Sequence, residues 1–140
     1  AFVGEFLPLN RNYFIGNLFF SILKKKPMTI TSSNLKKVFR SYLHADELVE
    51  WIMTILVRAN NKTEVFNVGS DQSISLFNLT QFFKYFYHLK NIKNTFNKNN
   101  KKLNVDFYIP SINKIKKRLK IDVRISLKKS IRKTYQDLIN

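Results

Sequence analysis

The residues Arg40-Ser41-Tyr42-Leu43-His44-Ala45-Asp46-Glu47-Leu48-Val49-Glu50-Trp51 combine a short strand pattern, the start of a helix and clustered charge. Residues 38–44 are rich in β-branched and aromatic side chains, with Arg40 and Tyr42 in alternation, which predicts a strand. An apolar pattern with helical spacing follows and predicts a helix from Asp46 to Arg58. Arg40 is therefore expected near the end of a strand, beside the start of a helix.

The predicted helix has one broad apolar face, formed by Leu48, Trp51, Ile52, Ile55 and Leu56. Asp46 is expected to cap this helix or to act as an acid in its first turn. Fixed cations and backbone N–H groups meet where such a strand and helix adjoin, and this arrangement suits an anion, above all a diphosphate.

Five stretches of the chain together resemble the NAD-dependent epimerase/dehydratase family, the extended short-chain dehydrogenases that act on nucleotide sugars. Arg40 to Val49 resembles a family segment that begins with Arg. In that segment the next position is Ser or Asp, and an aromatic residue, an aliphatic residue and then His or Tyr follow. The other four follow in the family's order, and they are Ala1 to Pro8, Ile15 to Phe19, Glu64 to Ser70 and Tyr108 to Leu119. Glu5, Ser111 and Lys120 depart from the usual Pro, Asp and Gly.

The resemblance covers only the C-terminal part of the family. It implies an α/β fold: the substrate-binding part of an extended short-chain dehydrogenase, a small mixed sheet with helices, with the Rossmann core largely missing. Residues 1–140 would form a single nucleotide-sugar-binding portion, in which residues 1–12 are the last strand and loop of the cofactor domain. The implied function is to hold the diphosphate of a nucleotide sugar in an isomerase or lyase of carbohydrate metabolism.

The resemblance also assigns residues to the ligand. Asn17 matches a helix Asn that hydrogen-bonds the diphosphate, and Arg40 matches the Arg whose planar fork pairs with it. Asp46 and Lys114 match motif positions for which we expect structural roles. The residues expected to contact the nucleotide are Tyr42, Met28, Ile30 and a basic residue, either Lys101 or Lys102, of which Lys102 is preferred. The residues expected near the nicotinamide of the cofactor are Phe2 and Val3.

Two parts of the family's chemistry are missing from the sequence. Its three glycines, at positions 4, 16 and 69, form no glycine-rich turn for the NAD diphosphate. No Tyr is followed four residues later by Lys, so the Tyr-Lys pair that would remove a hydroxyl proton is absent. We therefore expect this chain alone to hold no NAD and to catalyse nothing. Its expected partners are its own N-terminal domain, the cofactor NAD bound mainly by that domain, a nucleotide-diphosphate sugar and a second copy in a homodimer.

The net charge of +16, from 25 basic and 9 acidic residues, suggests an alternative function. A small basic module could bind nucleic acid through residues 114–132, or a protein through an aromatic helix. Nineteen of the basic residues are lysines spread from Lys24 to Lys133, which is typical of a solvated surface and makes nucleic acid the less favoured partner. The chain has no Cys and only two His, so a metal site is not expected. We expect a cytoplasmic location and no membrane span.

The remaining patterns predict short alternating strands and helices. Strands are expected at residues 1–3, 65–68 and 105–109, and a hairpin from residues 27–31 and 37–39. Helices are expected at residues 13–23, 111–119 and 126–139, and after a cap at Ser73 or Ser75, and a surface loop is expected at residues 91–102.

Overall fold

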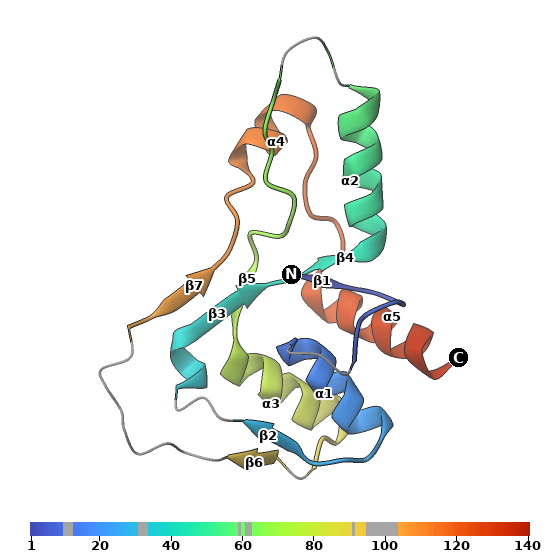
Figure 1. Ribbon diagram of the computed structural model, residues 1–140, viewed down its shortest axis with the longest axis vertical. Helices are drawn as coiled ribbons and strands as arrows, with labels where there is room; N and C mark the ends of the chain where they lie inside the picture. Colours follow the sequence, from blue (N-terminus) through green and yellow to red (C-terminus); the bar gives the residue numbers. More distant parts are fainter. Residues whose placement is uncertain (10–12, 31–33, 59, 61–62, 91, 95–103) are drawn as a thin grey trace. The chain divides into compact units, whose positions relative to one another are not determined.

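The computed structural model describes residues 1–9, 13–30, 34–58, 60, 63–90, 92–94 and 104–140 (Figure 1). In chain order the elements are β1 (Phe2–Val3), α1 (Phe14–Leu23), β2 (Met28–Ile30), η1 (Leu35–Lys37), β3 (Val38–Ser41), β4 (Leu43–His44), α2 (Ala45–Val57), β5 (Ser73–Ser75), α3 (Leu76–Tyr87), β6 (Ile92–Asn94), β7 (Asp106–Tyr108), α4 (Asn113–Leu119) and α5 (Leu127–Ile139). Within these described ranges, no helix has the length and apolar character that a membrane crossing needs. The α/β class is confirmed.

The chain divides into two compact units, each described by itself. Unit 1 comprises Ala1–Phe6, Ser41–Ser73 and Tyr108–Asn140, and unit 2 comprises Leu7–Arg40 and Ile74–Phe107.

Unit 1 is built on the parallel pair of β1 and β4, in which Phe2 lies opposite Leu43 and Val3 opposite His44. Both α2 and α5 contact this pair. Parallel strands need cover on their faces, and the two helices supply it. The buried core of the unit consists of Leu43, Trp51, Ile112, Ile115 and Leu119.

Unit 2 is built on the packing of α1 against α3. The rings of Phe19 and Phe83 meet edge to face, with 5.0 Å between their centroids. β2 pairs in parallel with β6 and contacts α1, and Met28 and Ile30 are buried on one face of β2. β3 lies between β5 and β7 in a three-stranded sheet, and residues 38–40, 74–75 and 106–107 of that sheet belong to this unit.

Most helix ends follow the sequence pattern. Ser75 caps α3 by accepting a hydrogen bond from the backbone N–H of Asn78 at 3.1 Å, and Ser126 caps α5 in the same way. The cap of α2 is the Nδ1 atom of His44, which accepts from the backbone N–H of Asp46 at 3.2 Å. Asp46 is therefore a first-turn acid of α2, which is the second of the two roles expected for it, and His44 takes the role of cap.

Three expected elements were wrong. Residues 27–39 do not form a hairpin, because β2 pairs with β6 while β3 pairs with β5 and β7, and η1 lies between β2 and β3. Residues 65–68 are not a strand, and Val65 is exposed. The expected loop at 91–102 contains β6 at residues 92–94, and its other positions lie outside the described residues.

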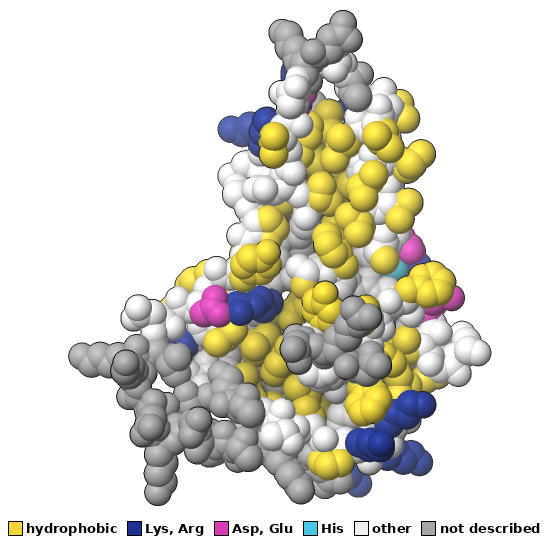
Figure 2. All heavy atoms as spheres, in the orientation of Figure 1, with side chains coloured by type: hydrophobic (Ala, Val, Ile, Leu, Met, Phe, Trp, Pro, Cys, Tyr) yellow, Lys and Arg dark blue, Asp and Glu magenta, His cyan; other side chains and the backbone are white. Residues whose placement is uncertain are grey.

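The apolar face of α2 divides in two. Trp51 is buried and Leu48 and Ile55 pack on the core, whereas Ile52 and Leu56 are exposed. The exposed residues belong to a second stripe at helical spacing, which we call the outer stripe of α2: Val49, Ile52, Met53 and Leu56. Figure 2 shows apolar side chains gathered on the surface over α2. Exposed apolar side chains gathered in this way are typical of surfaces that contact another protein or domain.

Lys120 follows α4 with φ at 56°, in the left-handed region that glycine adopts without strain. It is also the position at which the resembling motif has glycine. We predict that Lys120→Gly raises the free energy of unfolding by about 0.5–1 kcal/mol, because the strain of the left-handed conformation exceeds the extra chain entropy that glycine loses on folding.

The matched control is Lys117→Gly, the same replacement inside α4, which should lower the free energy of unfolding by about 1 kcal/mol. Urea unfolding of both variants measures the two changes. Loss of stability in Lys120→Gly comparable to that in Lys117→Gly would contradict the assignment of the left-handed end.

Candidate functional site

Arg40 is held by two hydrogen bonds at the carboxyl end of β3. Its Nη2 donates to Oδ2 of Asp106 at 2.7 Å, and its Nη1 donates to the backbone oxygen of Phe39 at 2.7 Å. The Arg40 side chain is 28% exposed and that of Asp106 is 52% exposed. The hydrogen bond from Arg40 lowers the pKa of Asp106, so the carboxylate is charged. In this structure Arg40 thus pairs with Asp106.

The sheet around Arg40 is reinforced by stacked rings. Phe39 precedes Arg40 on β3 and Phe107 follows Asp106 on β7, and their rings stack with centroids 4.7 Å apart and planes 17° apart. Neighbouring residues of a strand point to opposite faces, so the ion pair and the ring pair join the two strands from different sides. The guanidinium therefore lies on a braced sheet, meaning one in which an ion pair and a ring stack connect β3 to β7. Such support suits a residue that must hold an anion in a fixed geometry.

Asn17 lies half-buried on α1 in the same unit. It follows Gly16, at which an added Cβ would lie 2.4 Å from the backbone oxygen of Pro8. The glycine thus allows the preceding loop to cross the helix closely, beside Asn17. Met28 and Ile30 share the inner face of β2 and are 7% and 5% exposed, so their side chains belong to the interior of unit 2.

The other expected ligand residues belong elsewhere. Three of them, Tyr42, Phe2 and Val3, are in unit 1. The side chains of Tyr42 and Val3 are buried, and Phe2 is 41% exposed. Lys101 and Lys102 lie outside the described residues. The structure therefore places Asn17, Met28, Ile30 and Arg40 in one unit, and the ligand roles of all these residues stay predictions.

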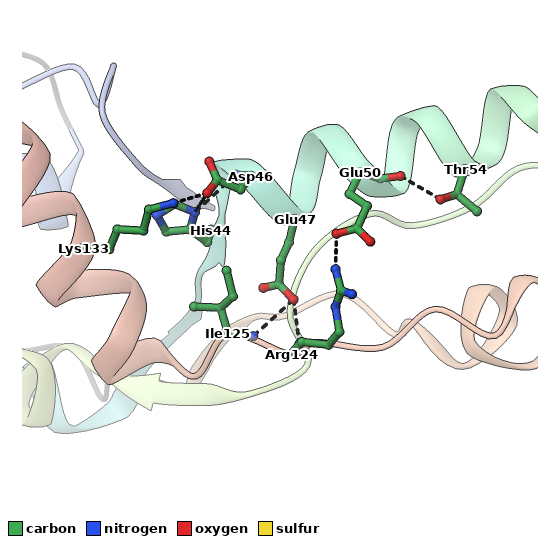
Figure 3. A network of polar contacts seen from close by, with 8 residues as sticks. All are labelled: His44, Asp46, Glu47, Glu50, Thr54, Arg124, Ile125 and Lys133. Carbon is green, nitrogen blue, oxygen red and sulfur yellow. Dashed lines mark hydrogen bonds and ion pairs between the residues drawn. The ribbon is translucent and has the colours of Figure 1, made fainter.

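Glu47 is the residue that the sequence analysis missed. It is 1% exposed, and Figure 3 shows it pointing from α2 towards a distant segment, where its Oε1 accepts hydrogen bonds from the backbone N–H groups of Arg124 at 2.6 Å and Ile125 at 3.2 Å. The available signal was its spacing, because Glu47 precedes Trp51 by four residues and so shares the buried face of α2. Close by, Glu50 pairs with the Arg124 guanidinium.

His44 and Asp46 form a second part of this network (Figure 3). Lys133 of α5 donates to the Asp46 carboxylate, which lowers the pKa of Asp46 and raises that of Lys133. The His44 ring is 1% exposed, and burial lowers the pKa of His44 below its ordinary value of 6.5. Its Nδ1 accepts a hydrogen bond, so the folded chain holds the neutral ring with the proton on Nε2.

A pocket of about 210 Å³ lies in unit 1, lined by Glu50, Trp51, Thr54, Arg58, Leu119, Lys120, Ile121, Asp122 and Arg124. Four of its charged side chains have partners: Arg124 pairs with Glu50, Asp122 with Lys116, and Arg58 donates to the backbone oxygen of Leu119. Among the residues that the structure describes, no three His, Asp or Glu side chains gather as a metal site requires.

Comparison with solved structures decides the fold. The UDP-glucose 4-epimerase of Thermotoga maritima, solved with UDP-glucose, superimposes with a TM-score of 0.82 at 18% identity, over 99% of this chain and 43% of its own. The dTDP-glucose 4,6-dehydratase of Bacillus anthracis, solved with NAD, gives 0.78 at 14% identity over 97% and 41%. The chain has the fold of the C-terminal part of these epimerase and dehydratase structures.

A third structure with the epimerase/dehydratase fold, the UDP-glucuronic acid 4-epimerase of Bacillus cereus in complex with NAD, gives a TM-score of 0.75 at 18% identity, over 99% of this chain and 40% of its own. The chain thus spans less than half the length of each of these proteins and corresponds to their C-terminal part. Neither a protein-family profile nor a curated protein matches the sequence. The expected fold is confirmed.

We predict that Glu47→Ala lowers the free energy of unfolding by about 2–6 kcal/mol, because two backbone N–H groups lose their partner, each at a cost of roughly 1–3 kcal/mol. The matched control is Glu50→Ala, one turn along α2, where an exposed ion pair is lost and the change should stay below about 1 kcal/mol. Chemical denaturation measures both. Equal losses would show that Glu47 does not fasten α2 to residues 124–125.

We predict that His44 makes stability depend on pH. Because its pKa is lower in the folded chain, the unfolded chain takes up the proton first as the pH falls below 6.5. The stabilisation is complete above that pH and is lost as the pH falls towards the folded pKa. Unfolding free energies measured from about pH 8 to pH 5 should therefore decline below about pH 6.5.

In His44→Asn this decline should disappear, since Asn caps the helix without titrating in that range. His88→Asn, at an exposed position, is the control and should retain the decline. A decline that persists unchanged in His44→Asn would assign the pH dependence to other groups.

Proposed function

We propose that this chain is the nucleotide-sugar-holding part of an NAD-dependent epimerase or dehydratase, and that Arg40 binds the ligand diphosphate. The observation that carries the proposal is the Arg40 guanidinium, which is fixed on a braced sheet and holds an anionic group, the Asp106 carboxylate, at 2.7 Å. Guanidinium pairs with phosphate oxygens through the same charge-assisted hydrogen bonds. The fold supports the ligand class, because proteins solved with UDP-glucose or UDP-glucuronic acid share it.

Asn17 is proposed as a second diphosphate contact, since its amide on α1 is half-buried and belongs to the same unit as Arg40. The remaining assignments follow the resemblance alone. They are Tyr42, Met28, Ile30 and Lys102 for the nucleotide, and Phe2 and Val3 for the cofactor. Met28, Ile30, Tyr42 and Val3 are buried, so a ligand would reach them only through their edges or their backbone.

The chemistry itself is proposed to come from a cofactor-binding domain that docks on this chain. The sequence has neither a glycine-rich turn for NAD nor a Tyr-Lys pair. The outer stripe of α2 supports such a partner, because these four apolar side chains lie 43–62% exposed. Which reaction results, isomerisation or elimination, depends on that domain. A homodimer of the whole protein and a cytoplasmic location belong to the same proposal.

A basic binding module is the second candidate. Exposed lysines on α4 and α5, among them Lys117, Lys128 and Lys129, give unit 1 a cationic surface that would attract polyanions. Binding of that kind weakens steeply as salt is added, whereas binding through Arg40 depends on one side chain.

We predict that Arg40→Lys in the full-length protein weakens nucleotide-sugar binding at least about tenfold, equivalent to roughly 1.4 kcal/mol, because Lys keeps the charge and loses the two-pronged geometry. NAD affinity should stay nearly unchanged. Calorimetry with UDP-glucose and with NAD measures the two affinities.

The matched control is Arg118→Lys, which changes an arginine that also pairs with an acid, Glu64, on α4 of unit 1. It should leave both affinities unaltered. If UDP-glucose binds Arg40→Lys as tightly as it binds the original protein, Arg40 has no diphosphate role.

A further inference from the structure

Both terminal nitrogens of Arg40 are engaged without any ligand. Nη1 donates to the backbone of its own strand and Nη2 donates to Asp106 of β7. A phosphate group can pair with the guanidinium through two nitrogens at either of two edges, Nη1 with Nη2 or Nε with Nη2, and both edges include Nη2. Nη2 is the atom that donates to Asp106, so the phosphate and the Asp106 carboxylate compete for it.

Asp106 is well suited to be exchanged. Its side chain is 52% exposed, and an ion pair at such exposure is weak, because water solvates the separated charges almost as well. The carboxylate is charged at neutral pH, since Arg40 lowers its pKa. If it stayed near Arg40 it would also repel an arriving diphosphate.

We propose that Asp106 is a built-in competitor of the ligand for Arg40. This inference rests on the proposed diphosphate role of Arg40. Without ligand, Asp106 neutralises the guanidinium and fastens β7 to β3. The diphosphate replaces it, and the carboxylate turns to solvent while the Phe39 and Phe107 stack keeps the two strands together. Asp106 thus sets the affinity of the site and couples ligand binding to the attachment of β7.

The test compares UDP-glucose affinities by calorimetry in the full-length protein. Asp106→Asn keeps the shape of the side chain and removes its charge, and we expect UDP-glucose to bind about three- to tenfold more tightly, the equivalent of roughly 0.7–1.4 kcal/mol. Asp71→Asn is the matched control: Asp71 pairs with Lys116 in unit 1, so the variant has the same change in net charge at a different ion pair. Its affinity should remain within about twofold of the original, since the charge that it removes belongs to a different ion pair.

A second measurement follows the carboxylate itself. The pKa of Asp106, measured by NMR titration, should rise towards its ordinary value of 3.8 when UDP-glucose is saturating, because Arg40 has then exchanged partners. A residue with only a structural role would show no such shift on ligand binding.

The outcomes separate the two proposals. If Asp106→Asn binds UDP-glucose no more tightly than the original, or the pKa of Asp106 does not move with ligand, while Arg40→Lys loses affinity, the competitor role is overturned and the diphosphate role of Arg40 stands. If neither Asp106→Asn nor Arg40→Lys changes the affinity, the diphosphate role fails and the competitor role fails with it. Weaker binding by Asp106→Asn would make Asp106 a support of the site and would also overturn the proposal.

Discussion

The buried carboxyl group of Glu47 joins α2 to residues 124 and 125 of unit 1, which lie 77 and 78 residues further along the sequence. Burying a carboxyl group is costly unless hydrogen bonds replace its lost water, and the backbone N–H groups of Arg124 and Ile125 provide two of them at Oε1. These residues lead into α5, which packs against β1 and β4. The position of α5 in unit 1 therefore depends on an acid in the first turn of α2.

Around that contact, other acidic residues of unit 1 form ion pairs with basic residues of different segments. Asp46 binds Lys133 of α5, Glu50 binds Arg124, and Lys116 lies between Asp71 and Asp122. Many of the nine acidic residues are thus used to connect segments, while most lysines remain on the surface. The net charge of +16 is in this respect a consequence of many solvated lysines and few acids, and it needs no polyanionic partner to explain it.

The elements that the sequence predicts well are those in which local chemistry decides the outcome. Ser75 and Ser126 start helices because a hydroxyl can accept the first unpaired N–H groups, and the apolar spacing around Trp51 defines α2. Pairing between strands, in contrast, is decided by parts of the chain that lie far away in the sequence. β2 could not be assigned to β6 from its own residues, because Ile92 to Asn94 lie in a polar segment whose composition is typical of a loop.

The same distinction applies to the candidate site. Arg40 was identifiable because its motif is local, whereas its partner Asp106 lies 66 residues away on a strand whose place beside β3 is a property of the fold. His44 as the cap of α2 was missed for another reason: a ring nitrogen accepts the hydrogen bond usually made by Asp or Ser, and the adjacent Asp46 fits the common pattern better.

We propose above all that unit 2 binds the diphosphate of a nucleotide sugar through Arg40. The most direct measurement is an NMR titration of the isotopically labelled chain with UDP-glucose at low and at physiological salt. The account predicts that shift changes concentrate at Arg40, Asn17 and the strands β3 and β7, and that they persist at the higher salt. Changes spread over the lysines of α4 and α5 that vanish with salt would contradict it and would favour a basic module that binds anions by charge alone.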